Sequence, residues 1–141
     1  MYQVKDFMTA EPICLKDNNS LHKGRTTMRK YSIRHIPIIY ADSGNFAGIL
    51  TQKVVLSNAI SIINTKGLEA LEDAEKSISI ESVMDTDVVT VEPETPLLDA
   101  ARFFKKNRHG CIAVLDEYKV VGILTSGDFV KFAIHALDES M

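Results

Sequence analysis

The amino-acid sequence predicts an α+β fold built from two tandem copies of one β-α-β-β-α unit. The tetrapeptide GILT occurs at residues 48–51 and again at residues 122–125, which is 74 residues later. Upstream of it, Met8 aligns with Met84 and Leu21 with Leu97, an offset of 76 residues. The order of apolar, turn and polar positions persists between these points, and the second copy has a central turn two residues shorter.

Each copy begins with a short extended segment that is followed by a helix. In the second copy Thr95 is a good N-cap, Pro96 suits the first helical position, and an apolar stripe follows at helical spacing. In the first copy Asn19 or Ser20 caps a helix whose stripe is weaker. The two extended segments are expected at residues 13–15 and 88–91.

Two β-rich runs joined by a tight turn come next, and a helix closes each copy. The runs are IPIIY and FAGILT in the first copy, and CIAVLD and VVGILT in the second. The closing helices are predicted at 54–63 and 128–137. A small sheet with helices on one face leaves its other face apolar, so we expect the copies to pack sheet to sheet with pseudo-two-fold symmetry. The boundaries expected are 1–63 for the first unit, 64–79 for a helical connector without chemistry of its own, and 80–141 for the second unit.

The bulk composition excludes several functions. The net charge of −3 argues against nucleic-acid binding, and no apolar run approaches the length of a membrane span. The N-terminus lacks the apolar segment of a secretory signal, so we expect a cytoplasmic protein with no membrane partner. Cys14 and Cys111 are expected as buried thiols, and the cysteine and histidine spacing predicts no metal site.

Three pairs of segments resemble the cystathionine-β-synthase (CBS) domain. They are the lead-ins VKDFMTAEPICL and IESVMDTDVVTV, the middle strands RHIPII and GCIAVL, and the string G-h-h-T-x-x-D (h, hydrophobic). That string is complete in GILTSGD but broken in GILTQKV, where Val54 replaces the acid. Two tandem copies resemble the CBS pair, and the resemblance covers roughly residues 3–137.

The resemblance implies a stand-alone regulatory module rather than an enzyme. CBS pairs bind adenosine-containing ligands, AMP, ADP, ATP or S-adenosylmethionine, in the cleft between their units, and they usually form homodimers. Such a module needs no cofactor, and it signals through dimer geometry or through a protein effector. In the family the Thr or Ser hydroxyl meets phosphate and the Asp holds the ribose hydroxyls. The alternative is a dimerisation or protein-interaction scaffold that binds no ligand.

The local sequence LTSGDF is chemically suited to such a ligand. A strand ends here and a helix begins, so the first helical amides point at whatever precedes them and favour an anion. Thr125 and Ser126 add hydroxyl donors, and Gly127 permits close approach to the backbone. Asp128 offers two acceptor oxygens to a vicinal diol.

The same residues also fit a helix cap. Thr125 and Asp128 have the spacing of a capping box, in which the acid accepts from the backbone of the N-cap residue, and this role requires no ligand. In the first copy Val54 cannot accept from a diol, so we expect one competent cleft rather than two. On the family pattern, that cleft is completed by Ile123 of the second unit and by residues of the first unit, which are Ile13, Ile33, Arg34 and His35.

Overall fold

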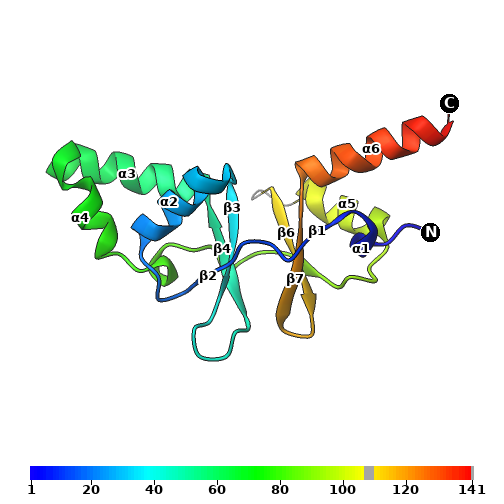
Figure 1. Ribbon diagram of the computed structural model, residues 1–141, viewed down its shortest axis with the longest axis horizontal. Helices are drawn as coiled ribbons and strands as arrows, with labels where there is room; N and C mark the ends of the chain where they lie inside the picture. The colour runs from blue at the N-terminus through cyan, green and yellow to red at the C-terminus, as the bar shows by residue number, and fades with distance from the viewer. Residues whose placement is uncertain (107–109, 141) are drawn as a thin grey trace. The chain divides into compact units, whose positions relative to one another are not determined.

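The computed structural model describes residues 1–106 and 110–140, and it confirms the α+β class and the doubled β-α-β-β-α order (Figure 1). The chain folds as two compact units. The continuous unit comprises Ile13–Asp87. The split unit combines Met1–Pro12 with the residues from Val88 onward.

The continuous unit contains a three-stranded sheet with the order β2-β3-β4. Strands β2 and β3 are parallel, whereas β3 and β4 form an antiparallel hairpin. The elements of the unit are β2 (Leu15–Lys16), α2 (Leu21–Tyr31), β3 (His35–Ile39), β4 (Phe46–Thr51), α3 (Gln52–Lys66), the 3₁₀ turn η1 (Leu68–Ala70), α4 (Leu71–Lys76) and the 3₁₀ turn η2 (Ile80–Ser82).

The split unit repeats this arrangement and adds a strand at one edge, so that its sheet order is β1-β7-β6-β5. Strand β5 is parallel to β6, and the β6–β7 and β7–β1 pairs are antiparallel. The elements of the unit are α1 (Val4–Phe7), β1 (Thr9–Ala10), β5 (Thr90–Val91), α5 (Leu97–Lys106), β6 (Cys111–Asp116), β7 (Lys119–Thr125) and α6 (Ser126–Ser140).

The compact units exchange the lead-in segments of the two repeats. The first lead-in pairs with β7 of the second repeat, with Thr9 opposite Ile123. The second lead-in pairs with β4 of the first repeat, where Asp85 and Ile49 exchange two backbone hydrogen bonds of 2.9 Å. The exchange satisfies the backbone groups of an exposed sheet edge, which would otherwise be open to pairing with another chain.

Both closing helices begin two residues before the predicted positions, α3 at Gln52 and α6 at Ser126. The side chain of Thr51 accepts a hydrogen bond from the backbone of Val54, which places the start of α3 at Gln52. Ser20, rather than Asn19, caps α2. The prediction for Thr95 was wrong, because α5 begins at Leu97 and the Thr95 hydroxyl accepts from the backbone N–H of Glu92.

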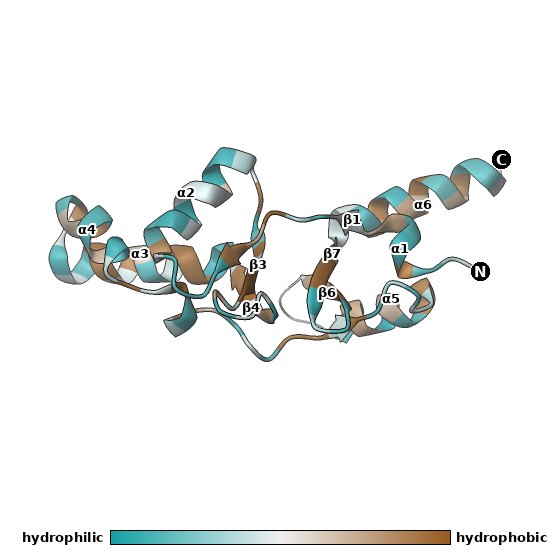
Figure 2. Cartoon of the chain, turned by 60° about the horizontal axis from the view of Figure 1, so that its bottom comes forward, coloured by the Kyte–Doolittle hydropathy of each residue, from teal (hydrophilic) through white to brown (hydrophobic). Residues whose placement is uncertain are grey.

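Each unit has an apolar core on one face of its sheet. The four long strands, β3, β4, β6 and β7, are themselves mostly hydrophobic (Figure 2). The core of the continuous unit is formed by Leu15, Leu21, Met28, Ile36, Ile38, Ala47, Leu50, Val55 and Ile80. The core of the split unit is formed by Val4, Val91, Ala100, Ile112, Val114 and Leu124.

The two GILT glycines should respond differently to substitution by alanine. A Cβ at Gly48 would lie 2.5 Å from the backbone oxygen of Asp85, whereas a Cβ at Gly122 would lie 2.5 Å from the flexible Sδ of Met8. We expect Gly48→Ala to lower the free energy of unfolding by about 3 kcal/mol and Gly122→Ala by about 1 kcal/mol, because only the methionine can move aside. Urea denaturation of both variants measures the difference. Equal losses would contradict the role of the Asp85 backbone.

Candidate functional site

The candidate site lies where β7 ends and α6 begins. Asp128, in the first turn of α6, is only 2% exposed. Its Oδ2 accepts a hydrogen bond of 2.9 Å from the backbone N–H of Thr125. Its Oδ1 accepts a hydrogen bond of 2.9 Å from the hydroxyl of Thr9 and lies 3.7 Å from Nζ of Lys131. The acid therefore performs its half of the predicted capping box and also ties the first lead-in to α6.

Thr9 is a site residue that the sequence reasoning missed. It lies 119 positions from Asp128 in the chain, and strand β1 brings it there by pairing with β7. The signal available in the sequence was the hydroxyl of Thr9 in a lead-in that aligns with Asp85 of the second copy. The Thr9 hydroxyl can be assigned to the site only when the first lead-in is known to pair with β7 of the second repeat.

The turn above Asp128 faces solvent. Ser126 and Gly127 are both exposed, and Thr125 is half-buried. A Cβ built on Gly127 meets only the Thr125 hydroxyl oxygen, at 3.8 Å, so the space in front of this backbone is open. An accessible helix N-terminus above a buried carboxylate is suited to an anion carrying a hydrogen-bond donor.

Cys111 lies beneath this turn, paired with Thr125 across the β6–β7 hairpin. Burial, and secondarily the negative charge of Asp128, raise the pKa of the Cys111 thiol to about 12. The thiol therefore stays protonated and unreactive at neutral pH. Burial also raises the pKa of Cys14. Both cysteines are thiols, as predicted, but only Cys111 is buried, whereas Cys14 is half-buried.

The other predicted site residues fall into both units. Ile123 lies on β7, opposite Thr9, and so belongs with Thr125–Asp128 in the split unit. Ile13, Ile33, Arg34 and His35 belong to the continuous unit.

Within the continuous unit, three of these residues connect α2 to β3. Ile33 packs against the apolar core, and its backbone N–H donates to the Met28 carbonyl at the end of α2. Arg34 is exposed, and its carbonyl accepts from the backbone N–H of Gln52 at 2.8 Å. His35 begins β3 opposite Thr51. Arg34 therefore presents a cation to solvent, and Ile33 has a packing role.

The equivalent turn in the first repeat has a different chemistry. Val54 stands where the second repeat has Asp128, and it packs against the apolar core of the continuous unit. Thr51 caps the helix without an acidic partner at that position. The carboxylate of this copy is instead on the lead-in, where Asp85 aligns with Thr9. This turn of the first repeat therefore lacks a counterpart of Asp128, the buried acid of the candidate site in the second repeat.

Residues 1–106 and 110–140 contain no group of three His, Cys, Asp or Glu side chains placed to hold a metal ion. No helix in these segments combines the length and apolar character needed to cross a membrane.

Two copies of one β-α-β-β-α unit, each ending in a strand that leads directly into a helix, are the components of a CBS domain pair. The family model for the CBS domain matches residues 4–61 and 80–135. The chain therefore belongs to the CBS domain family.

Similar proteins agree with this assignment. A protein from Vibrio cholerae described as an acetoin utilization protein (AcuB) is 33% identical, with a TM-score of 0.79 over 98% of this chain and 94% of that one. The CBS domain pair of protein MJ0100, solved in complex with 5′-methylthioadenosine and S-adenosyl-L-methionine, is 27% identical, with a TM-score of 0.76 over 96% and 98% of the two chains. L-aspartate semialdehyde sulfurtransferase of Methanocaldococcus jannaschii is 29% identical over 91% of this chain, which spans only 22% of that enzyme.

Proposed function

We propose that this chain is a regulatory CBS pair that binds an adenosine-containing ligand at the turn Thr125–Asp128. The observation that supports the proposal is an exposed Ser126–Gly127 backbone directly above a carboxylate that is 2% exposed. The MJ0100 pair, which is similar over nearly its whole length, was solved with 5′-methylthioadenosine and S-adenosyl-L-methionine. In this proposal the protein binds a signal molecule and is not an enzyme.

The proposed ligand uses the charges already present at this turn. Anionic groups of the ligand meet the first amides of α6 and the hydroxyls of Thr125 and Ser126. A ribose hydroxyl donates to Oδ1 of Asp128 in place of Lys131, whose side chain is 70% exposed and can turn away. Lys131 then becomes available to a phosphate or carboxylate of the ligand. We propose that Ile13, Ile33, Arg34 and His35 complete the cleft together with Ile123, as the family resemblance implies.

We further propose that the module forms a homodimer and passes its signal through dimer geometry or to a protein effector. The closing helices support this assignment, because each carries the same exposed apolar stripe. The equivalent pairs are Leu56 and Val130, Ile60 and Ile134, and Ile63 and Leu137, with exposed fractions between 36% and 63%. A stripe repeated in both units favours a symmetric contact with a second copy.

One observation favours the alternative, a scaffold that binds no ligand. The hydrogen bonds from Thr9 and Thr125 account for the position of Asp128 without any ligand. Under this alternative Asp128 is only a helix cap, and the module serves to hold two proteins together.

Thermal unfolding with a panel of ligands distinguishes the two functions. The panel contains AMP, ADP, ATP, S-adenosylmethionine, 5′-methylthioadenosine and NAD. A specific ligand stabilises the folded chain by about 2.7 kcal/mol at a concentration 100 times its dissociation constant, whereas a scaffold gains nothing. We expect at least one ligand to raise the melting temperature of the wild type.

A matched pair of variants locates the site without disturbing the cap. Gly127→Leu fills the open space in front of the turn, and Lys53→Leu makes the same substitution at the equivalent position of the first repeat. We expect Lys53→Leu to keep the ligand-dependent shift and Gly127→Leu to lose it. A panel without any effect on the wild type would favour the scaffold.

A further inference from the structure

The two units differ in how the groove between their two long helices is covered. In the continuous unit α4 lies against both α2 and α3. From α4, Glu75 enters the groove and is fully buried. It accepts two hydrogen bonds from Nε of Arg25, at 2.8 Å and 3.0 Å, and lies 3.5 Å from Nδ1 of His22. A helix with a buried acid therefore closes this groove.

The equivalent groove of the split unit lies between α5 and α6, and its chemistry is apolar. The alignment of the repeats places Leu98 where the first copy has His22, and Ala101 where it has Arg25. On the closing helix, Phe132 stands in place of Asn58. The groove encloses a cavity of about 210 Å³ lined by Met1, Tyr2, Leu97, Leu98, Ala101, Phe129 and Phe132. The substitutions remove the polar groups that receive Glu75 in the continuous unit.

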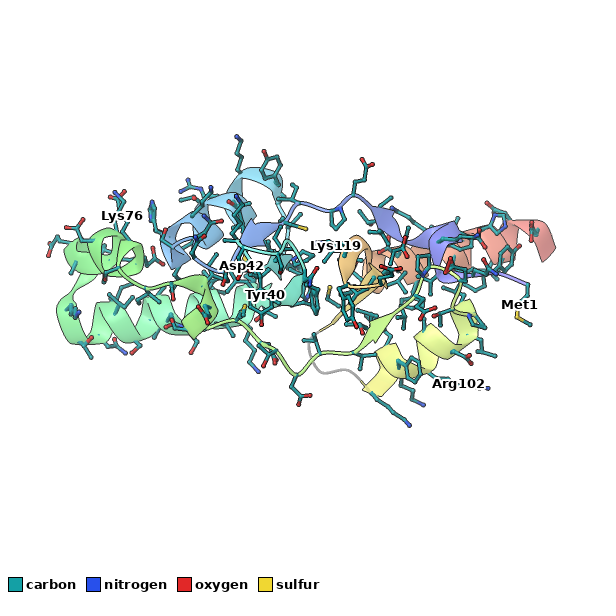
Figure 3. The ribbon with its side chains drawn as sticks, turned by 90° about the horizontal axis from the view of Figure 1, so that it is seen from below. Met1, Tyr40, Asp42, Lys76, Arg102 and Lys119 are labelled. Atoms are coloured by element: carbon teal, nitrogen blue, oxygen red, sulfur yellow. The ribbon has the colours of Figure 1, made fainter. Side chains whose placement is uncertain are left out.

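The N-terminal residues leave this cavity open on one side. Residues 1–12 align with residues 77–88, so Met1 and Tyr2 reach the groove from just beyond the position that α4 occupies in the continuous unit. Met1 is fully exposed, Leu98 is 62% exposed and Tyr2 is 38% exposed. Figure 3 shows Met1 at the end of the split unit beside α5, which carries Arg102.

We propose that the α5–α6 groove docks an amphipathic helix of a partner protein, which inserts one apolar side chain where α4 inserts Glu75. An apolar cavity of about 150 Å³ holds a benzene molecule, so the space suits a side chain of the size of Leu, Met or Phe. The first repeat supplies the docking geometry, because in the continuous unit helix α4 covers the equivalent groove between α2 and α3. An acidic helix is rejected, because a carboxylate buried among Leu98, Ala101 and Phe132 finds no cation there.

The groove is distinct from the surface proposed for self-association. The stripe Val130, Ile134 and Leu137 has a counterpart in the continuous unit, whereas the apolar lining of the groove does not. None of the three stripe residues lines the cavity. The proposal does not depend on adenosine binding, since Thr125–Asp128 do not line this cavity.

A peptide taken from this protein provides the probe. A fluorescein-labelled peptide of residues 64–79 with Glu75→Leu is titrated against the full chain by fluorescence polarisation, and the unaltered peptide is the matched control. We expect the leucine peptide to bind at least 10-fold more tightly than the control. Leu98→Asp, at an exposed position, should weaken its binding at least 10-fold while the melting temperature of the chain changes little.

A second measurement guards against the low helicity of a short free peptide. Residues 64–76 are fused directly before Met1, which gives the grafted helix the spacing of α4 and a high effective concentration at the groove. We expect the graft with Glu75→Leu to raise the melting temperature above that of the graft with Glu75.

The same melting temperature for both grafts, together with equal binding of both peptides, would overturn the proposal. If the leucine peptide instead dissociates a dimer in sedimentation velocity, the occupant is a second copy and the assignment to a partner protein is wrong. The ligand panel on Leu98→Asp tests adenosine binding separately.

Discussion

Replacing Asp128 by alanine is expected to lower the free energy of unfolding by about 3 kcal/mol. The substitution removes the acceptor of the Thr125 backbone N–H and of the Thr9 hydroxyl, and hydrogen bonds to a charged group contribute about 1.5–3 kcal/mol each. We expect the ligand-dependent rise in melting temperature to vanish as well, because the ribose acceptor is gone. Urea denaturation with and without ligand measures both effects.

Two controls separate the role of Asp128 in the cap from its role in ligand binding. Thr9→Val removes only the donor to Oδ1 and should cost about 1.5 kcal/mol, the lower limit of that range, because Thr9 is exposed. Asp128→Asn keeps an acceptor for the Thr125 backbone N–H but lacks the charge, so most of the stability should remain while ligand affinity falls. If Asp128→Ala were as stable as the wild type, the buried network would have no energetic role. If Asp128→Asn bound ligand normally, the charge would play no part in recognition.

The second large effect is expected at Glu75. Glu75→Ala leaves the Arg25 guanidinium without its carboxylate at the groove between α2 and α3. Breaking a buried ion pair by removing one partner costs about 3–5 kcal/mol. The Arg25 side chain is 30% exposed and can regain some hydration, so we expect a loss near the lower limit of that range, about 3 kcal/mol. Chemical denaturation measures the loss.

Glu72 offers the matched control on the same helix. Its side chain is 62% exposed and pairs with Lys76 at 3.4 Å, so Glu72→Ala should change stability by less than about 0.5 kcal/mol. The double variant Arg25→Leu/Glu75→Leu should recover much of the stability lost in Glu75→Ala, because an apolar pair avoids the cost of desolvating two charges. Equal losses for Glu72→Ala and Glu75→Ala would show that the connector is not held by this ion pair.

The fold class could be predicted from the sequence because its signals are local. GILT, the alternation of apolar residues around it and the threonine before each closing helix all act within one or two turns of the chain. The exchange of lead-ins was not predictable in the same way. The first lead-in pairs with β7 and the second with β4, and this pairing depends on which sheet edge is free in three dimensions. The connector shows the same limit, because the contact of Glu75 with Arg25 spans 50 positions of the chain.

In the candidate site too, contacts between residues close in the chain could be predicted, whereas contacts made through strand pairing could not. Thr125 and Asp128 are three positions apart at one strand–helix junction, and the sequence predicted their capping box and their proximity. Thr9 reaches them only through strand pairing, so no pattern near Asp128 indicates it. Ile33 illustrates the opposite case, since a residue placed in the site by family resemblance contributes a side chain to the core of its own unit.

The discontinuity of the split unit has a consequence for synthesis on the ribosome. The continuous unit is complete once residue 87 has left the ribosome, so it can fold while the remainder of the chain is still being made. Met1–Pro12 have emerged earlier, but β1 cannot pair until β7 (Lys119–Thr125) has been made. Strand β1 therefore emerges before the continuous unit but finds its place after it, and the unit that carries the candidate site forms second.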